Sequence, residues 1–371
     1  MRVLHLIKGL GLGGAERLLV ALAQRRDRSA FEFDVAYLLR AKAALVPVLA
    51  DAGVKVECLD AGLELDLRWA ARLRHRLRHR PVDVVHCHSP YVAGIARLAV
   101  RTLAARHRPA LVTTEHLPWS GYRVTTRWLN RATFAFDDAS FAVSEQVRRS
   151  APARLQGRVE VLVHGVDVAA IRARRVRRES ARASLGAEDG EVLIGTIANY
   201  REQKAYPDLL AAARLVADEG IPARFVAVGQ GPLEAEVRRR RDELGLAGRF
   251  ILTGPMEDPA VILAACDVFV LASHYEGYPV AVMEALAMGL PVVATRVGGV
   301  PDAVRDGVEG VLVEPGRPDQ LAAALCRMAT DPILRASCAA RSEERGVRFD
   351  LAPAAGRLAQ AYLELTGRSR A

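Results

Sequence analysis

Clustered cysteines and long apolar runs are both missing from this sequence. Its 371 residues include five cysteines, but no C-x-x-C pair or repeated spacing occurs, so neither a disulfide framework nor a cysteine zinc site is indicated. No apolar stretch approaches the roughly 18 residues of a membrane span, and the apolar run at the N-terminus is too short for a secretory signal. These absences predict a cytoplasmic protein that is soluble or peripheral on the inner face of the cell membrane.

Positive charge is unevenly distributed along the chain. The formal net charge is +9. Residues 1–170 hold 26 Lys+Arg against 16 Asp+Glu, or +10, whereas residues 171–371 hold 26 against 27, or −1. A basic surface can attract nucleic acid, an anionic membrane or a phosphorylated ligand, and the count alone does not choose among them.

Strand-like apolar runs alternate with amphipathic helical segments throughout the sequence. The first half begins VLHLI, AERLLVALAQR and FDVAYLL, and the second half restarts the rhythm with EVLIGTIANY and DLLAAARLVADEG. This alternation predicts an α/β fold whose parallel sheets are covered on both faces by helices. We therefore predict two tandem doubly wound, Rossmann-like domains facing a central cleft, at 1–170 and 171–352. A C-terminal helix at 353–371 is predicted to pack back on the first domain, and the Arg-rich segment 172–182 marks the join.

A glycine-rich loop, GLGLGG at residues 9–14, follows the first predicted strand. It contains G-x-G-x-x-G, the fingerprint of dinucleotide-binding enzymes, which also place an acidic residue at the end of the second strand. Here Glu32 and Asp34 lie at the beginning of that strand and Arg40 at its end, which disfavours an NAD-linked oxidoreductase. The loop still suits phosphate binding at a helix N-terminus; the alternative is a tight turn without a ligand.

Two glutamates, Glu276 and Glu284, lie eight positions apart in EGYPVAVMEALAMGLPV. Pro279 suits a first helical position, and Gly289 is expected to end the helix after about three turns. We therefore predict Glu276 in the loop at the mouth of a short helix and Glu284 on its second turn, with free amides at 280–281 that can hold a phosphate. The alternative, two solvated charges, is weak for Glu284 because its neighbours leave little polar face.

Several short motifs occur together in a characteristic order. They are GGAE at 13–16, HCHS at 86–89, TEH at 114–116, VSE at 143–145, HGVD at 164–167, VGQGP at 228–232, the spaced pair of glutamates and DGVEGVLVEPG at 306–316. In this combination the sequence resembles family 4 of the nucleotide-sugar glycosyltransferases, which have the GT-B architecture. The resemblance covers nearly the whole chain. It implies a retaining transferase that moves a sugar from a nucleotide donor, bound mainly by the second domain, to an acceptor bound mainly by the first.

The resemblance also implies roles for individual residues. His116 would face the transferred sugar, Glu276 would contact it, and Lys204 would neutralise the leaving phosphate; these three are the predicted catalytic residues. Glu284 would hold the donor ribose. The full set of predicted donor-binding residues is Gly13, Gly14, Asn199, Arg201, Lys204, Met256, Gly277, Tyr278, Pro279, Val280, Ala281 and Glu284. His86 and His88 are assigned to the acceptor side.

One position departs from the family pattern. The family usually has an arginine five residues before the lysine, where this chain has Asn199, and Arg201 follows two positions later. Either Arg201 reaches the diphosphate instead, or the site functions with one cation and Arg201 is a solvated loop residue. Fixed cations and amides aimed at the leaving phosphate would stabilise the transition state more than the ground state.

No metal ion or other cofactor is expected to be required. The histidines His86, His88 and His116 could suggest a metal site. However, a histidine at the end of a strand more often forms hydrogen bonds or contacts a substrate. The sequence also has no D-x-D pair, and the family generally binds its donor through cations and amides.

The substrates are less well defined by the sequence. On family frequency, a UDP-sugar is preferred to a GDP-sugar as the donor. The predicted acceptor is a glycan or a lipid-linked molecule in polysaccharide or glycoconjugate biosynthesis; the alternative acceptor is a soluble small molecule. No nucleic-acid partner is expected. The segment 67–80 is predicted to form a helix that packs on the sheet through Trp69, Leu73 and Leu77. Its arginines, and Arg97 nearby, are predicted to face outward, where they could dock on an anionic membrane. A noncatalytic nucleotide-binding protein and a hydrolase remain alternatives.

Overall fold

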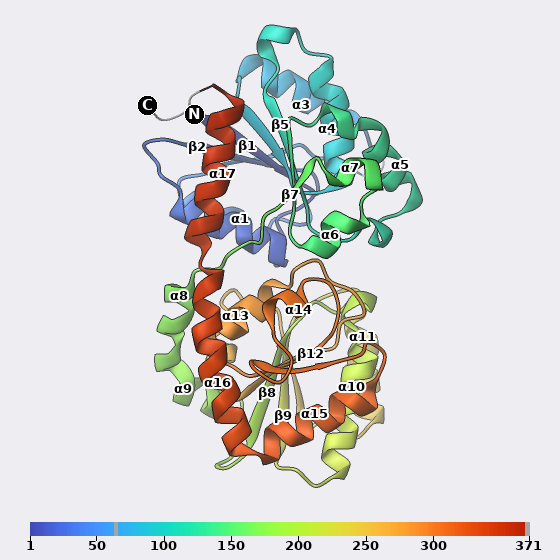
Figure 1. Ribbon diagram of the computed structural model, residues 1–371, viewed down its shortest axis with the longest axis vertical. Helices are drawn as coiled ribbons and strands as arrows, with labels where there is room; N and C mark the ends of the chain where they lie inside the picture. The colour runs from blue at the N-terminus through green and yellow to red at the C-terminus, as the bar shows by residue number, and fades with distance from the viewer. Residues whose placement is uncertain (63–65, 368–371) are drawn as a thin grey trace. The chain divides into compact units, whose positions relative to one another are not determined.

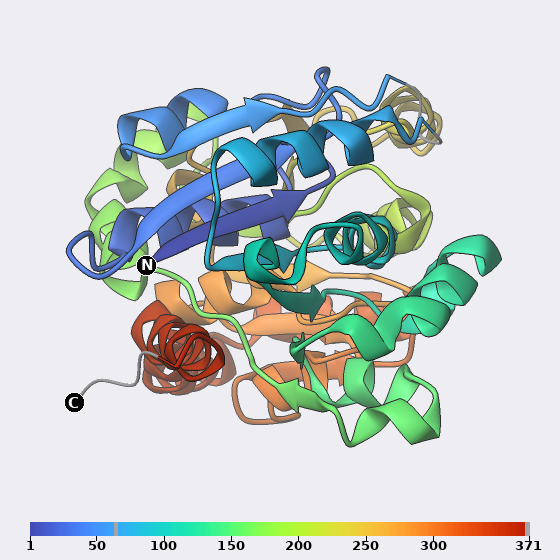
Figure 2. The ribbon, with the colours of Figure 1, turned by 90° about the horizontal axis from the view of Figure 1, so that it is seen from above.

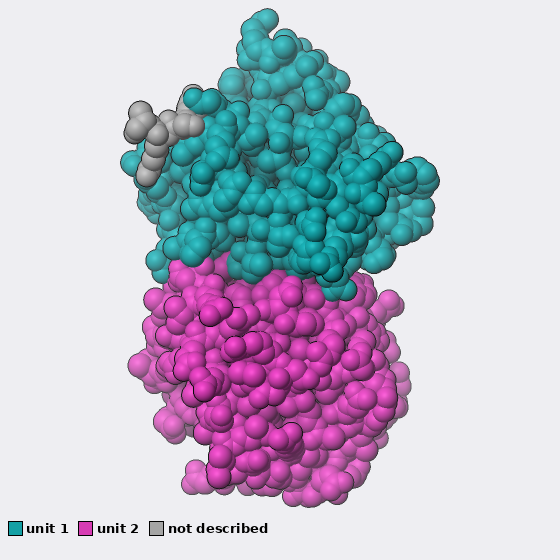
Figure 3. Space-filling model, viewed as in Figure 1, with its two compact units in different colours: residues 1–164, 351–371 teal, residues 165–350 magenta. Residues whose placement is uncertain are grey.

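The computed structural model describes residues 1–62 and 66–367, and the chain forms two compact units (Figures 1 and 3). Unit 1 contains residues 1–164 and 351–371, and unit 2 contains residues 165–350. The chain therefore passes from one unit to the other twice. The unit 2 residues next to these two crossings pair through a bridge between Val166 and Asp350.

Unit 1 is built on a seven-stranded parallel sheet in the order β3-β2-β1-β4-β5-β6-β7. Across the sheet, the strand numbers fall from β3 to β1 and then rise from β4 to β7. The switch point of the sheet therefore lies between β1 and β4. The strands are β1 (Arg2–Ile7), β2 (Glu32–Tyr37), β3 (Lys55–Cys58), β4 (Val84–Cys87), β5 (Ala110–Glu115), β6 (Ala139–Ala142) and β7 (Val159–Val161). The helices are α1 (Gly14–Arg25), α2 (Val46–Asp51), α3 (Arg68–His79), α4 (Pro90–Arg101), α5 (Val124–Thr133), α6 (Glu145–Ser150), α7 (Ala153–Gln156) and α17 (Leu351–Leu365).

Helices cover both faces of the unit 1 sheet because its strands are apolar on both sides. Leu4 and Leu6 of β1 belong to the core under α3 and α4. Val3, from the alternate face, packs with Leu358 and Tyr362 of α17, which Figure 2 shows nearly end-on in red. The predicted packing of the segment 67–80 through Trp69, Leu73 and Leu77 is confirmed, since all three belong to the α3 side of this core.

Two of the arginines that were predicted to face outward are instead buried. Arg76 of α3 is 7% exposed and donates to Asp34 at 2.8 Å and to Glu57 at 2.9 Å. Arg97 of α4 is fully buried, and its Nε donates to Asp137 Oδ1 at 2.7 Å. Helical periodicity identifies the apolar stripe but not the carboxylates that other segments bring to the helix, and a paired guanidinium can be buried.

Unit 2 is built on a six-stranded parallel sheet in the order β10-β9-β8-β11-β12-β13, with its switch point between β8 and β11. The strands are β8 (Val192–Ile197), β9 (Ala223–Val228), β10 (Phe250–Gly254), β11 (Val268–Leu271), β12 (Val292–Thr295) and β13 (Gly310–Val313). The helices are α8 (Val168–Ala173), α9 (Arg178–Ser184), α10 (Tyr206–Asp218), α11 (Glu234–Glu243), α12 (Ala260–Ala265), α13 (Val280–Met288), α14 (Val300–Ala303), α15 (Pro318–Thr330) and α16 (Pro332–Gly346). In the described parts of both units, no helix has the length and apolar character needed to cross a membrane.

The Arg-rich segment 172–182, predicted as the join, is mostly helical and lies within unit 2. Four of its six arginines donate to carbonyl groups at the C-terminal ends of neighbouring helices, namely Arg172, Arg175, Arg178 and Arg182. Arg175 donates to Met288 O at 2.7 Å, and Arg178 donates to Cys266 O at 2.8 Å. The sequence suggests a linker here because the segment is polar, but its guanidinium groups satisfy backbone acceptors that helix ends leave open.

Candidate active site

The switch point of unit 2 brings together two loops that carry predicted site residues. The loop after β8 contains 199–204, and the loop after β11 contains 273–276. Gln203 joins the two loops through two hydrogen bonds. Its side-chain Nε2 donates to Tyr275 O at 2.9 Å, and its backbone carbonyl accepts from His274 N at 2.9 Å. The carboxyl edge of a sheet at its switch point is where open α/β sheets bind ligands.

Glu276 lies at the centre of this arrangement and is 4% exposed. Its Oε1 accepts from Lys204 Nζ at 2.5 Å and from Ser273 Oγ at 2.6 Å, and its Oε2 accepts from Gln203 Nε2 at 3.3 Å. A buried carboxylate needs such partners because burial without them is costly. The structure thus brings together Lys204 and Glu276, two of the predicted catalytic residues, as an ion pair. It also adds Ser273 and Gln203, whose ordinary polar character gave no sequence signal.

A third loop, after β12, supports the turn that begins at Glu276. Gly298 has φ +57°, and a Cβ there would lie 2.3 Å from Glu276 O. A Cβ on Gly299 would lie 2.3 Å from the ring of Tyr278, and Gly299 N donates to Gly277 O at 2.7 Å. Only glycine fits these positions without a shift. Neither glycine was among the predicted site residues, although the VGG that follows a predicted strand was a visible signal.

Helix α13 presents a single partly exposed face beside this turn. It begins at Val280 with Pro279 as its N-cap, one residue later than predicted, and ends at Met288. Its C-cap is Gly289, which has φ +86° as expected for a glycine that follows a helix. Val280, Ala281 and Glu284 are partly exposed, whereas the other residues of the helix are buried. The first amides of the helix and the carboxylate of Glu284 therefore lie on one face, one turn apart.

The loop that ends at Lys204 is held in an unusual backbone conformation. Ala205, the next residue, is buried and has φ +48° and ψ 46°. This left-handed conformation costs a non-glycine residue about 1–2 kcal/mol, and such strain often occurs at functional sites. Arg201 is exposed, and within the described residues no hydrogen bond or ion pair is found for its side chain. Asn199 is partly buried in the same loop.

The motif VGQGP packs against the loop after β8. A Cβ on Gly229 would lie 2.1 Å from Ala198 O, and one on Gly231 would lie 2.4 Å from Tyr200 O. These glycines let the 228–232 segment approach the backbone before Lys204. Met256, predicted near the donor base, is partly exposed in the loop after β10.

In unit 1, the glycine-rich loop joins β1 to α1 as predicted. Gly13 is the N-cap, and α1 begins at Gly14, which is exposed. Asp34 of β2 is buried in ion pairs with Arg76 and Arg80. These ion pairs give Asp34 a structural role in unit 1.

Five histidines gather at the carboxyl edge of the unit 1 sheet, around its switch point. His5 lies on β1, His86 on β4, and His88, His116 and His164 follow β4, β5 and β7. The structure thus brings together the predicted His86, His88 and His116. It adds His5 and His164; the HGVD motif contained His164, but its proximity to the others depends on strand order.

The environment of these histidines keeps them neutral. Burial lowers the pKa of His116 to about 4 and holds the pKa values of His5, His86, His88 and His164 well below the usual range. The hydroxyl of Tyr362 from α17 lies 2.6 Å from His86 Nδ1, and Thr114 Oγ1 lies 2.8 Å from His86 Nε2.

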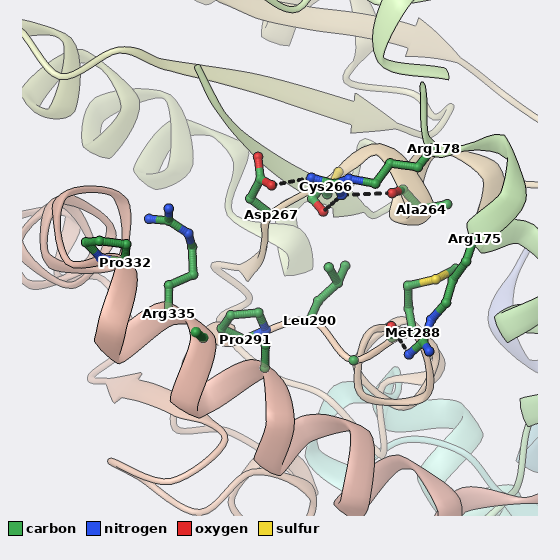
Figure 4. Close-up of a pocket in the computed structure, with 13 residues that line it drawn as sticks. Arg175, Arg178, Ala264, Cys266, Asp267, Met288, Leu290, Pro291, Pro332 and Arg335 are labelled. Atoms are coloured by element: carbon green, nitrogen blue, oxygen red, sulfur yellow. Dashed lines mark hydrogen bonds and ion pairs between the residues drawn. The ribbon is translucent and has the colours of Figure 1, made fainter. Parts of the chain in front are cut away.

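A cavity of about 450 Å³ lies in unit 2 at the opposite, amino edge of the sheet (Figure 4). Arg175, Arg178 and Arg335 reach it. Their guanidinium groups donate to carbonyls at the ends of α13, α12 and α15, respectively. These arginines are accounted for by helix capping, and none of the predicted site residues lines the cavity.

Comparisons with known proteins agree with this organisation. A model described as "Glycosyltransferase Family 4" matches residues 12–170, and one described as "Glycosyl transferases group 1" matches residues 191–331. The D-inositol 3-phosphate glycosyltransferase of Actinosynnema mirum is 31% identical, with 91% of this chain and 89% of that protein covered. The 2-deoxystreptamine glucosyltransferase of Streptomyces kanamyceticus is 31% identical over 53% of this chain and 51% of that protein. The crystal structure of Anabaena HepE in complex with UDP and glucose matches with a TM-score of 0.86 and 22% identity, covering 97% of this chain and 99% of HepE.

These similarities extend over both units. The two family matches lie on the two sheets, the Actinosynnema relative is similar along nearly the whole chain, and HepE shares the fold. The chain is therefore a glycosyltransferase and belongs to glycosyltransferase family 4, with the GT-B architecture.

Proposed function

We propose that the protein transfers a sugar from a UDP-sugar to an acceptor hydroxyl with retention of the anomeric configuration. The observation that carries this proposal is the pair formed by the partly buried Lys204 and the buried Glu276, which lies in the loop before α13 at the switch point of unit 2. A fixed cation next to free helix amides suits a diphosphate leaving group. The UDP found in the HepE structure supports the choice of nucleotide.

In this proposal α13 binds the donor nucleotide. The amides of Val280 and Ala281 meet the diphosphate, and Glu284, one turn further along the same face, accepts hydrogen bonds from the ribose hydroxyls. The backbone of the turn at 277–279 contributes to the same site, and Met256 approaches the base. The same proposal assigns Gly13 and Gly14, at the start of α1, to the donor phosphate.

Lys204 acts on the bond that breaks. As the bond between the sugar carbon and the phosphate oxygen opens, negative charge grows on the diphosphate. The acceptor oxygen forms the new bond to that carbon on the face that the diphosphate leaves, and the proton of its hydroxyl passes to the departing diphosphate. An ammonium fixed by Glu276 stabilises this charge without reorganisation. Arg201 supplies a second cation in place of the family arginine, because its exposed guanidinium has no carboxylate partner among the described residues. Glu276 and His116 contact the transferred sugar, and no metal ion is needed.

Replacing Glu284 with alanine should weaken UDP binding by about 10- to 100-fold. A hydrogen bond to a charged group contributes about 1.5–3 kcal/mol, and each 1.4 kcal/mol changes affinity tenfold. Titration calorimetry with UDP and GDP measures the effect. Glu179→Ala removes a glutamate from an exposed position on α9; it is the control and should bind UDP normally. An unchanged affinity in Glu284→Ala would remove this residue from the donor site.

The surface of α5 favours a lipid-linked acceptor. Val124 is 56% exposed and Trp128 64% exposed, and they lie one turn apart. Arg127 and Arg131 adjoin them on the same face, with the Arg131 guanidinium carbon 5.5 Å from the Trp128 ring centroid. Tryptophan beside basic residues is typical of contacts with anionic bilayer surfaces. The two relatives named for D-inositol 3-phosphate and 2-deoxystreptamine support the alternative, a soluble small-molecule acceptor.

The protein should sediment with anionic vesicles at low salt and be released at high salt. Each basic group near the surface contributes about 1 kcal/mol, which salt screens. Trp128→Ala should weaken this binding, whereas Ile333→Ala, which removes an exposed apolar side chain from unit 2, should not. Trp128 is the exposed tryptophan of the three, so its fluorescence should shift to the blue on binding. Failure to bind anionic vesicles at low salt would favour the soluble acceptor.

A further inference from the structure

Four of the clustered histidines form a continuous chain of ring contacts within unit 1. His5 Nδ1 lies 2.9 Å from His88 Nε2, and His88 Nδ1 lies 3.4 Å from His116 Nε2. His116 Nδ1 then lies 3.2 Å from His164 Nε2. Every link joins the Nδ1 atom of one ring to the Nε2 atom of the next, and both ring nitrogens of His116 are engaged.

This pattern restricts the protonation of all four rings. A neutral imidazole carries one N–H donor and one acceptor nitrogen. All three links can therefore form together only if the four rings share a tautomer: either every ring is protonated at Nδ1, or every ring is protonated at Nε2. A single ring of the other type would place two donors or two acceptors against each other.

The buried end of the chain decides between the two tautomers. His5 is 1% exposed, stacks on Phe33 with ring centroids 4.0 Å apart, and its Nε2 has no hydrogen-bond partner. Protonation at Nε2 would leave an unpaired N–H there, whereas protonation at Nδ1 leaves only a lone pair. An orphaned buried donor is the rarer of the two situations. At the other end His164 is partly exposed, so water can accept from its Nδ1–H.

The same cluster is a poor metal site. His5, His86 and His88 offer ring nitrogens within 4.8 Å of one another. However, the rings of His86 and His88 stack with centroids 4.3 Å apart at 26°. An imidazole lone pair lies in the plane of its ring, so stacked rings do not aim at one ion at about 2.0–2.1 Å. Both nitrogens of His86 are also engaged, by Tyr362 and Thr114.

We propose that His5, His88 and His164 are positioning residues that fix His116 as its Nδ1–H tautomer, with Nε2 as an acceptor. The link from His88 to His116 Nε2 is the longest of the three and the one that a ligand hydroxyl would replace most easily. A sugar hydroxyl arriving there meets a lone pair, so it is recognised as a donor. This specificity rests on the proposed function, in which His116 faces the transferred sugar.

The tautomers can be read directly by long-range proton–nitrogen NMR of the whole protein labelled with ¹⁵N-histidine at neutral pH. His116→Gln and the corresponding single variants assign the signals among the nine histidines. We expect His5, His88, His116 and His164 to be neutral and protonated at Nδ1. Any of the four found protonated at Nε2, or charged, would overturn the proposal.

A pair of variants tests positioning separately from folding. His164→Leu removes the acceptor for His116 Nδ1–H, so the His116 signals should shift and a mixture of tautomers should appear. His164→Gln, whose side-chain carbonyl can accept at a similar position, should restore the wild-type pattern. His107→Leu, outside the chain of contacts, is the matched control and should leave His116 unchanged. An unaltered His116 signal in His164→Leu would overturn the proposal.

Adding UDP-glucose to the labelled wild-type protein tests the contact of His116 with the donor sugar separately from the tautomer of His116. If the proposed function is right, His116 Nε2 should shift while His5 does not. If UDP-glucose leaves His116 unchanged but the Nδ1–H tautomers are present, the positioning chain stands and the placement of His116 at the donor sugar fails.

Discussion

Lys204→Ala should lower kcat by about 100-fold or more, the scale on which removing one preorganised electrostatic group slows an enzyme. The ammonium is 2.5 Å from Glu276 and its side chain is 18% exposed, so the protein holds it in place before the substrate arrives. Its charge would interact more strongly with the diphosphate as that group leaves than with the intact donor. The variant should therefore lose kcat at saturating donor in addition to affinity.

The measurement is sugar release from UDP-sugars, with the melting temperature followed in parallel. Lys55→Ala, at an exposed position on the edge strand β3, is the matched control and should keep full activity. Wild-type activity should also survive EDTA, because the proposal uses no metal. A normal kcat in Lys204→Ala at saturating donor would mean that Lys204 serves only in binding.

Arg97→Leu should destabilise unit 1 by about 3–5 kcal/mol, the cost of breaking a buried ion pair by removing one partner. Arg97 is fully buried and Asp137 nearly so, and two hydrogen bonds at 2.7 and 2.5 Å join them. Arg97 also donates to Asn130 Oδ1 at 2.7 Å. The substitution would leave the Asp137 carboxylate buried with only hydroxyl partners.

Urea unfolding followed by tryptophan fluorescence measures this effect in unit 1, because all three tryptophans lie there. Arg238→Leu breaks an exposed pair with Glu234 on α11 and should change stability by less than about 1 kcal/mol. The double variant Arg97→Leu/Asp137→Leu should recover part of the loss, since no charge is then stranded. A loss below about 1 kcal/mol in Arg97→Leu would contradict the importance of this pair.

The loss of stability caused by Arg97→Leu, relative to the wild type, should be smaller at acidic pH. Burial raises the pKa of Asp137 even beside Arg97, and without the guanidinium this pKa should rise further. A carboxyl group whose pKa is raised in the folded state stabilises that state when protonated. The variant therefore regains stability as the pH falls through this raised pKa, and the difference from the wild type narrows.

Local patterns in the sequence were enough to predict the secondary-structure elements and the C-terminal end of α13. Alternating apolar and amphipathic segments predicted parallel sheets with helices on both faces, and Gly289 predicted the end of α13, because glycine takes a positive φ at low cost. The stripe of Trp69, Leu73 and Leu77 predicted how α3 packs. Each of these inferences depends on residues a few positions apart.

The partners of individual side chains were not predictable in this way. Outward-facing arginines were expected on α3 and α4, yet Arg76 and Arg97 are buried beside carboxylates 42 and 40 positions away in the chain. Likewise, the segment 172–182 was predicted as the join between the domains because it is polar. Its arginines cap helix ends that lie far away in the sequence, and no neighbouring residue indicates this.

The sequence by itself determined the family and the two-sheet organisation, since motifs in order and short-range periodicity carry that information. It also predicted Lys204, Glu276 and His116 as catalytic residues, through the resemblance to the family. Only the tertiary structure decided that Lys204 pairs with Glu276 and that His5 and His164 join His88 and His116 in one chain. The physical reason is strand order. Parallel strands that are far apart in sequence become neighbours at one edge of a sheet, and hydrogen bonds of about 3 Å then depend on that placement.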